Sequence, residues 1–227
     1  MSKFGQKGEQ HFLAVIGDLR RSREDLDRAR TQLRLEAALE SINRKFAGDL
    51  AARFIITLGD EFQGLLKIPG DVFRVIKDID HDLEGLPIRF GLGWGSLSTE
   101  SRPEAIGMDG PCFHHARAAI LRSKDEDRAV VVAGFGEQAD LALNGVLALM
   151  EGVRQRWKPA QAETVRLMTG RSLQKEVAKL RGVSTSVVSE TLKSTLYRPM
   201  LESEHSLELL MNHFAESMHP STNMEAP

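Results

Sequence analysis

The alternation of apolar runs with amphipathic stretches predicts most of the secondary structure. Residues 12–17 (FLAVIG) form an apolar run rich in strand-forming side chains that ends in Gly-Asp, which predicts a buried strand followed by a turn. Residues 24–49 repeat apolar side chains at helical spacing among many charges, which predicts a long amphipathic helix. Further along we expect strands at 53–58 and 62–66, a helix at 71–83, a strand at 87–99, a helix at 111–123 and a strand at 129–133.

This order predicts an α+β fold. The strands at 53–58 and 62–66 are separated by a tight Gly59-Asp60 pair, which is typical of a β-hairpin. The order is therefore β-α-β-β-α-β followed by α-β, which is the ferredoxin-like (βαββαβ) arrangement with an αβ extension. We assign it to residues 1–153, with a linking helix at 140–157.

The strand expected at 87–99 carries glycines at alternate positions. They are Gly91, Gly93 and Gly95. Glycines in a strand allow another backbone or a ligand to come close, and the sequence leaves both alternatives open.

The pattern changes after Trp157, where three short helices are predicted at 159–168, 173–181 and 185–196. Gly170 would end the first helix and Ser172 would cap the second. Gly182 would supply a left-handed turn and Ser184 would cap the third helix, with Val187, Val188 and Leu192 facing inward. We therefore predict an all-α helix-turn-helix DNA-binding domain over residues 154–216; the alternative is a three-helix bundle used for protein contacts.

The rest of the C-terminal region is acidic. We expect a helix near 202–216 that packs or mediates dimers, and a disordered tail at 217–227.

Charge supports the DNA-binding interpretation. The chain has a net charge of −2, yet residues 154–198 contain ten Lys or Arg against three Asp or Glu. Such a basic segment indicates a polyanionic partner, although a solvated helical face would account for part of it. In a helix-turn-helix, the third helix enters the major groove. The side chains expected to face bases or phosphates are Thr185, Ser186, Ser189, Glu190 and Lys193.

Composition bounds the location of the protein. A single cysteine, Cys112, rules out an internal disulfide framework and is expected to be a small buried side chain. No stretch approaches the ~20 apolar residues of a membrane span, and residues 1–10 lack the apolar core of a secretory signal. We therefore expect a cytoplasmic protein with no membrane association.

Carboxylates follow two of the predicted strands. Asp18 comes just after the first strand, and Asp60 and Glu61 lie at the hairpin tip. In a βαββαβ sheet the hairpin tip can approach the end of the first strand, so the acids could hold Mg²⁺ or Mn²⁺. Each acid also has a structural alternative: Asp18 as a helix cap, Asp60 as turn chemistry and Glu61 as a solvated residue.

Four segments together resemble the SatD family over nearly the whole chain: AVIGDLRRSR at 14–23, ITLGDEFQGLL at 56–66, RFGLGWGSL at 89–97 and DGPCFHHARAAI at 109–120. They are also similar to class III nucleotidyl cyclases and, more distantly, to GGDEF palm domains. That resemblance implies that Asp18 and Asp60 are metal ligands and that Gly59 shapes the hairpin tip. It further implies nucleotide contacts from Gly59, Glu61, Arg89, His114 and Arg117, and a homodimer with shared sites.

Three departures separate the chain from active cyclases. Ile56 stands where those enzymes read the base with a Lys, and Leu58 precedes Gly59 where the GGDEF domains have a second glycine. His114 stands at the position of an Asn, and Arg117 follows it three residues later instead of four. The metal-binding half of the machinery is therefore expected, whereas the catalytic half is not matched.

Other side chains near these motifs have two interpretations each. Arg117 could grip phosphate or pair with an acid such as Asp109. We expect one of His114 and His115 to be a satisfied core or interface residue and the other exposed. Arg20, Arg21 and Arg23 could contact phosphate or belong to a solvated helix start.

These features favour a DNA-binding regulatory protein whose cyclase-like domain binds a nucleotide, a divalent metal or both, and mediates dimerisation. The alternative is an active Mg²⁺- or Mn²⁺-dependent enzyme acting on nucleoside triphosphates. A third interpretation is a two-domain adaptor in which the acids are structural.

Overall fold

A five-stranded mixed sheet forms the centre of the protein in a computed structural model that describes residues 10–20, 28–84, 86–169 and 173–218. The strands are β1 (His11–Leu19), β2 (Leu50–Leu58), β3 (Glu61–Leu66), β4 (Ile88–Ser96) and β5 (Val130–Ala133), in the order β2-β3-β1-β4-β5. β1 runs antiparallel to β3 and β4, β2 is antiparallel to β3, and β5 is parallel to β4. The protein is therefore of the α+β class.

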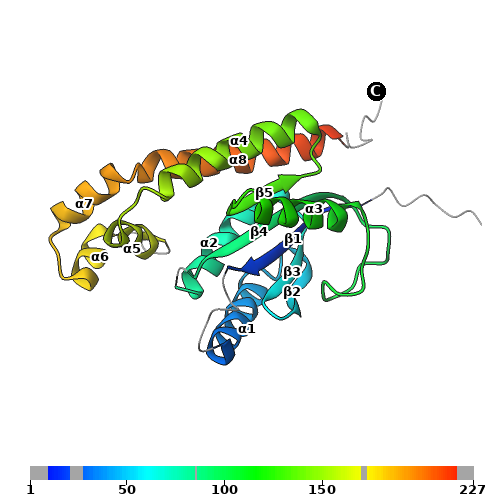
Figure 1. The fold of residues 1–227 in the computed structure, drawn as a ribbon, viewed down its shortest axis with the longest axis horizontal. Helices are drawn as coiled ribbons and strands as arrows, with labels where there is room; N and C mark the ends of the chain where they lie inside the picture. Colours follow the sequence, from blue (N-terminus) through cyan, green and yellow to red (C-terminus); the bar gives the residue numbers. More distant parts are fainter. Residues whose placement is uncertain (1–9, 21–27, 85, 170–172, 219–227) are drawn as a thin grey trace, which may run out of the picture.

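Helices cover the sheet and extend beyond it (Figure 1). They are α1 (Arg28–Lys45), the 3-10 turn η2 (Pro69–Asp71), α2 (Val72–Asp82), α3 (Pro111–Asp125), α4 (Glu137–Arg154), α5 (Pro159–Met168), α6 (Gln174–Arg181), α7 (Thr185–Ser194) and α8 (Tyr197–Met218). None of the described helices is long and apolar enough to cross a membrane.

The central strand β1 is buried on both faces. Leu13 and Val15 join a large core built with α1, α2, α4 and α8, whereas Ala14 and Ile16 join a second core built with α3. Successive side chains of a strand point to opposite faces, so α3 covers one face of the sheet and the other helices of the first core cover the opposite face. This arrangement explains the unbroken apolar run at 12–17.

The alternate glycines of β4 allow α3 to lie directly on the sheet. A Cβ at Gly93 would be 2.1 Å from the backbone nitrogen of Ala116, and one at Gly91 would be 2.4 Å from that of Ile120. The group that comes close to these glycines is therefore a helix backbone.

The last helix, α8, packs back on the α/β part and lies beside α4 (Figure 1). Its Leu207 and Met211 are buried in the large core, and Asn212 Oδ1 accepts a hydrogen bond from the backbone nitrogen of Gly70 at 2.8 Å. By contrast, α5, α6 and α7 share a small core of their own. Packing thus divides residues 154–216, which the sequence assigns to one domain.

Some boundaries differ from the expected ones. The helix predicted at 24–49 ends at Lys45, and β2 begins at Leu50 instead of residue 53. The expected start of that helix, the Gly170 and Ser172 signals and most of the tail at 217–227 lie outside the described residues.

Candidate functional site

Two carboxylates lie side by side where β1 ends and β3 begins. Asp18 and Glu61 are partners in the antiparallel pairing of these strands. Directly opposite residues of an antiparallel pair place their side chains on the same face, and here that face is the one covered by α3. The hairpin between β2 and β3 turns at Gly59, whose φ of 64° lies in the left-handed region that glycine adopts readily.

Two cations from α3 bind these carboxylates. Arg117 donates two hydrogen bonds to Glu61, of 2.6 and 2.7 Å, and Lys124 Nζ lies 3.0 Å from Asp18 Oδ1. The hydrogen bonds to Glu61 raise the pKa of Arg117. The two cations are seven residues apart, so they lie on one face of the helix two turns from each other. We call Asp18, Glu61, Arg117 and Lys124 the ion-pair cluster.

The sequence interpretation did not include Lys124, although its spacing from Arg117 is a usable signal. The sequence gives Arg117 two interpretations, a phosphate contact or an ion pair with an acid such as Asp109; in the structure its guanidinium binds the acid Glu61. The side chain of Asp60 is half-buried at the hairpin tip, next to Glu61.

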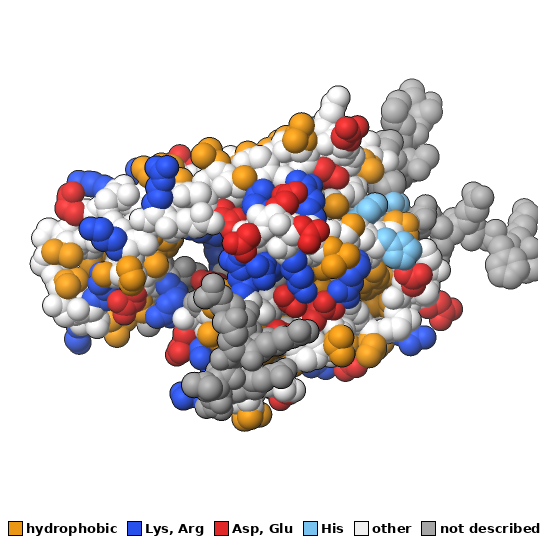
Figure 2. Space-filling view, viewed as in Figure 1, with side chains coloured by type: hydrophobic (Ala, Val, Ile, Leu, Met, Phe, Trp, Pro, Cys, Tyr) orange, Lys and Arg blue, Asp and Glu red, His pale blue; other side chains and the backbone are white. Residues whose placement is uncertain are grey.

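A second group of charges adjoins this cluster. Arg89 is the β4 partner of Asp18, and its guanidinium lies 2.8 Å from Asp127, which also contacts Arg20. The hydrogen bond from Arg89 holds the pKa of Asp127 below its usual value. Asp127 was not among the predicted residues. Figure 2 shows Lys, Arg, Asp and Glu side chains gathered on the face that α3 covers.

The start of α3 has structural contacts. His114 is exposed and lies 2.8 Å from Asp109, while the Nδ1 atom of His115 lies 2.7 Å from the carbonyl oxygen of Trp94. Cys112 is fully buried, and burial raises the pKa of its thiol to about 11. A thiol that stays protonated at neutral pH is a poor nucleophile.

The ion-pair cluster has the donor set for a metal-bound phosphate. Within the described ranges, no group of three or more His, Cys, Asp or Glu side chains is arranged to hold a metal ion. Mg²⁺, however, commonly binds through one or two carboxylates together with phosphate oxygens and waters. Carboxylates from Asp18 and Glu61 beside cations from Arg117 and Lys124 fit that chemistry.

A second candidate surface is the helix α7. Gly182 between α6 and α7 has a φ of 64°, and the Ser184 hydroxyl accepts a hydrogen bond from the backbone nitrogen of Val187 at 3.3 Å. This turn packs α7 on α5 and α6 around four buried side chains, namely Val177, Ala178, Val188 and Leu192.

The outer face of α7 carries all five residues predicted to read DNA. Thr185, Ser186, Glu190 and Lys193 are exposed and Ser189 is half-buried. Lys193 lies 2.9 Å from Glu190 on the same face. The expectation that Val187 packs inward is wrong, because it is 47% exposed while Val188 is buried. Adjacent helical residues point about 100° apart, so only one of the two valines can face the small core.

Comparison with known proteins identifies a family and distant similarity to solved structures. The model of the SatD family matches residues 12–209. A crystal structure titled regulator of polyketide synthase expression, from Bifidobacterium adolescentis, is 14% identical, covers 95% of this chain and 84% of its own, and has a TM-score of 0.27. No curated protein matches the chain.

Proposed function

This chain belongs to the SatD family, and we propose that it is a DNA-binding regulatory protein whose α/β domain binds a nucleotide together with a divalent cation. The two halves of this proposal rest on different surfaces. The exposed face of α7 supports DNA binding, and the ion-pair cluster beneath α3 supports nucleotide binding.

The observation that carries the proposal is the way α7 is presented. The left-handed turn at Gly182 and the Ser184 cap separate α6 from α7, which supports a helix-turn-helix. Its N-terminal residues Thr185 and Ser186 are exposed, which is where recognition helices meet base edges. The excess of Lys and Arg over residues 154–198 favours a polyanionic partner.

Lys193→Ala tests the DNA-binding half. With duplex DNA selected from a random pool by the wild-type protein, we expect the affinity to fall about fivefold and the slope of log K against log salt to shrink by about 0.9, because one phosphate contact is lost. Fluorescence anisotropy over a salt series measures both quantities.

Lys67→Ala is the matched control for this experiment. Lys67 is an exposed lysine next to β3 whose Nζ donates to the Gly48 carbonyl oxygen, and its removal should leave DNA affinity unchanged. If Lys193→Ala binds DNA like the wild type at every salt concentration, α7 does not contact the phosphate backbone through Lys193.

For the nucleotide half, we infer that a metal-bound nucleotide replaces the ion pairs of the cluster. The metal would take Asp18 and Asp60, with Glu61 available beside them, while phosphates would take Arg117 and Lys124. Arg89, the β4 partner of Asp18, and His114, three residues before Arg117 on α3, would be further contacts, and Gly59 sets the hairpin tip. The β2-β3-β1-β4 order supports a ferredoxin-like, palm-type domain.

Thermal unfolding with nucleoside triphosphates and cyclic dinucleotides, with and without Mn²⁺, tests this half. A ligand at about a hundredfold above its Kd should raise the Tm by about 5 °C, and only when Mn²⁺ is present. Asp60→Asn should abolish the shift, since a neutral amide is a weaker metal ligand.

Asp125→Asn, at the exposed end of α3, is the matched control and should retain the shift. Circular dichroism checks that each variant is folded. The nucleotide proposal fails if the wild type shows no metal-dependent shift, or if Asp60→Asn shifts like the control.

A second candidate function is an Mg²⁺- or Mn²⁺-dependent enzyme on nucleoside triphosphates. The observation that favours it is that Arg117 lies at the paired carboxylates, because cations beside a metal site stabilise charge in phosphoryl transfer. Product formation by the wild type that is absent in Asp60→Asn would identify it. The proposal also includes a homodimer, which the mass in solution tests.

A further inference from the structure

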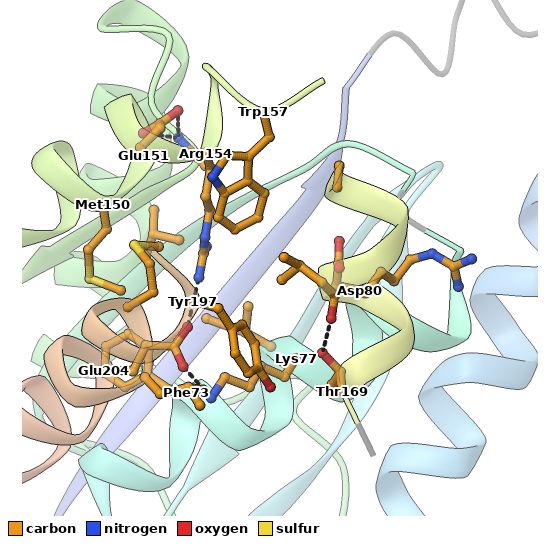
Figure 3. Close-up of a pocket in the computed structure, with 18 of the residues that line it drawn as sticks. Phe73, Lys77, Asp80, Met150, Glu151, Arg154, Trp157, Thr169, Tyr197 and Glu204 are labelled. Atoms are coloured by element: carbon orange, nitrogen blue, oxygen red, sulfur yellow. Dashed lines mark hydrogen bonds and ion pairs between the residues drawn. The ribbon is translucent and has the colours of Figure 1, made fainter. Parts of the chain in front are cut away.

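A cavity of about 840 Å³ separates the α/β part from the helical unit formed by α5, α6 and α7. Its walls come from α2, α4 and the first residues of β4 and β5 on one side and from α5 and the start of α8 on the other. Trp157, in the short link between α4 and α5, forms part of the wall (Figure 3). The volume lies within the range of pockets that hold small molecules.

The polar groups of the cavity have an excess of donors. Glu204 of α8 is buried and is shared by two cations, Lys77 and Arg154, the latter at 2.7 Å. The indole Nε1 of Trp157 is a buried donor that has no hydrogen-bond partner within the part of the chain that the structure describes. Both features favour a ligand that brings an acceptor.

The charges around the cavity also favour a ligand with an anionic group. Three of its carboxylates, Glu84, Glu151 and Glu163, are paired with arginines outside the lining. The remaining charges are carboxylates of Asp80 and Glu204 against cations of Lys77, Arg154 and Arg166. Desolvation by the surrounding protein raises the pKa of Asp80, against the effect of Arg154 and Arg166. One positive charge is therefore left without a carboxylate.

The apolar walls fit a planar molecule. Figure 3 shows the rings of Trp157 and Tyr197 facing the space, with Met150 beside them. Aromatic rings and methionine sulfur pack well against planar apolar groups.

We propose that this cavity is an effector site for a small planar apolar molecule with one anionic group, an aromatic carboxylate or sulfonate, whose binding changes the affinity of α7 for DNA. The anionic group would bind Arg154 and Lys77, and the planar part would lie against Trp157 and Tyr197. Because Trp157 links α4 to α5, an occupant touches both the α/β part and the unit that carries α7. The effect of the ligand on DNA affinity rests on the proposed DNA-binding function.

The fluorescent probe 8-anilinonaphthalene-1-sulfonate has this chemistry and tests the site directly. We expect saturable binding of one probe per chain, with energy transfer from tryptophan that is reduced more in Trp157→Phe, which removes the donor in the cavity wall, than in Trp94→Phe. Trp94 is buried and stacked on Phe135, away from the cavity. Near-unchanged circular dichroism and Tm show that the probe is reporting on folded protein.

Charge and space at the site are tested separately. Arg154→Gln should weaken probe binding about fivefold or more, whereas Arg156→Gln, an exposed arginine that does not line the cavity, should change it less than about twofold. Ala162→Trp fills the cavity from the exposed surface of α5 and should also weaken binding.

DNA affinity measured with and without saturating probe tests the coupling. We expect a change of about threefold or more in the wild type and none in Arg154→Gln. Absence of saturable binding to folded protein, or equal binding by Arg154→Gln and Arg156→Gln, overturns the site. Probe binding without a change in DNA affinity overturns the coupling. If the wild type binds no DNA at all, the proposed DNA-binding function is overturned, and the probe data alone decide whether the effector site exists.

Discussion

Gly93 is the point of closest approach between the sheet and α3. The nearest atoms to a Cβ placed there are the backbone nitrogen of Ala116 and the backbone carbonyl oxygen of Cys112, at 2.1 and 2.2 Å. Backbone atoms of a packed helix cannot move aside as the end of a flexible side chain can. Glycines in β4 therefore let α3 lie directly on the strand, and this close packing holds Arg117 and Lys124 over the carboxylates.

Gly93→Ala tests this contact. We expect it to lower the free energy of unfolding by about 3 kcal/mol or more, because α3 must lift off the sheet. The control is Gly145→Ala on the exposed side of α4, where a Cβ meets nothing within 4 Å; there we expect a gain of about 0.5–1 kcal/mol from helix propensity. Urea unfolding followed by circular dichroism gives both values, and equal effects at the two sites would refute the packing argument.

The ion-pair cluster was predictable at the residue scale only in part. The expected βαββαβ order sets the third strand beside the first, and the structure pairs Asp18 with Glu61 there; the shared metal site of Asp18 and Asp60 stays a prediction. Lys124 was not singled out: its spacing from Arg117 places both cations on one helix face, but an exposed lysine on a helix does not reveal its partner. Nothing in local periodicity distinguishes a solvated charge from one that reaches across to a strand.

At the scale of elements, the runs that are buried on both faces were the most predictable. The unbroken apolar sequence of β1 and the Gly59-Asp60 pair each predicted a correct element. Boundaries were less accurate where packing overrides pattern: Phe46 is buried although α1 ends at Lys45, so its apolar side chain extended the predicted helix. Val187 and Val188 were both assigned inward because the pattern alone does not set the rotation of a short helix.

At the scale of the whole molecule, α8 was the main difference from the sequence interpretation. Its helical pattern was visible, but its site of packing was not, because α4, α2 and η2 lie far from it in sequence. The result is a helix that leaves the α5–α7 unit and returns to the α/β core (Figure 1). The same return path forms one wall of the cavity, so the two parts of the chain are joined by more than the link at Trp157.

Glu204 lies where α8 meets α2 and α4, and its removal tests how firmly α8 is held. Glu204→Ala leaves Lys77 and Arg154 without their shared carboxylate. Both cations are partly exposed and can be hydrated, so we expect the free energy of unfolding to fall by about 2 kcal/mol. Removing one partner of a fully enclosed ion pair would cost more, about 3–5 kcal/mol. Hydrogen exchange should show α8, α4 and α2 losing protection together.

The control is Glu202→Ala, at an exposed glutamate two residues before Glu204 on α8. It should change the free energy of unfolding by less than about 0.5 kcal/mol. If the two variants unfold alike, apolar contacts such as Leu207 and Met211 hold α8 without help from the buried carboxylate, and the walls of the cavity do not depend on it.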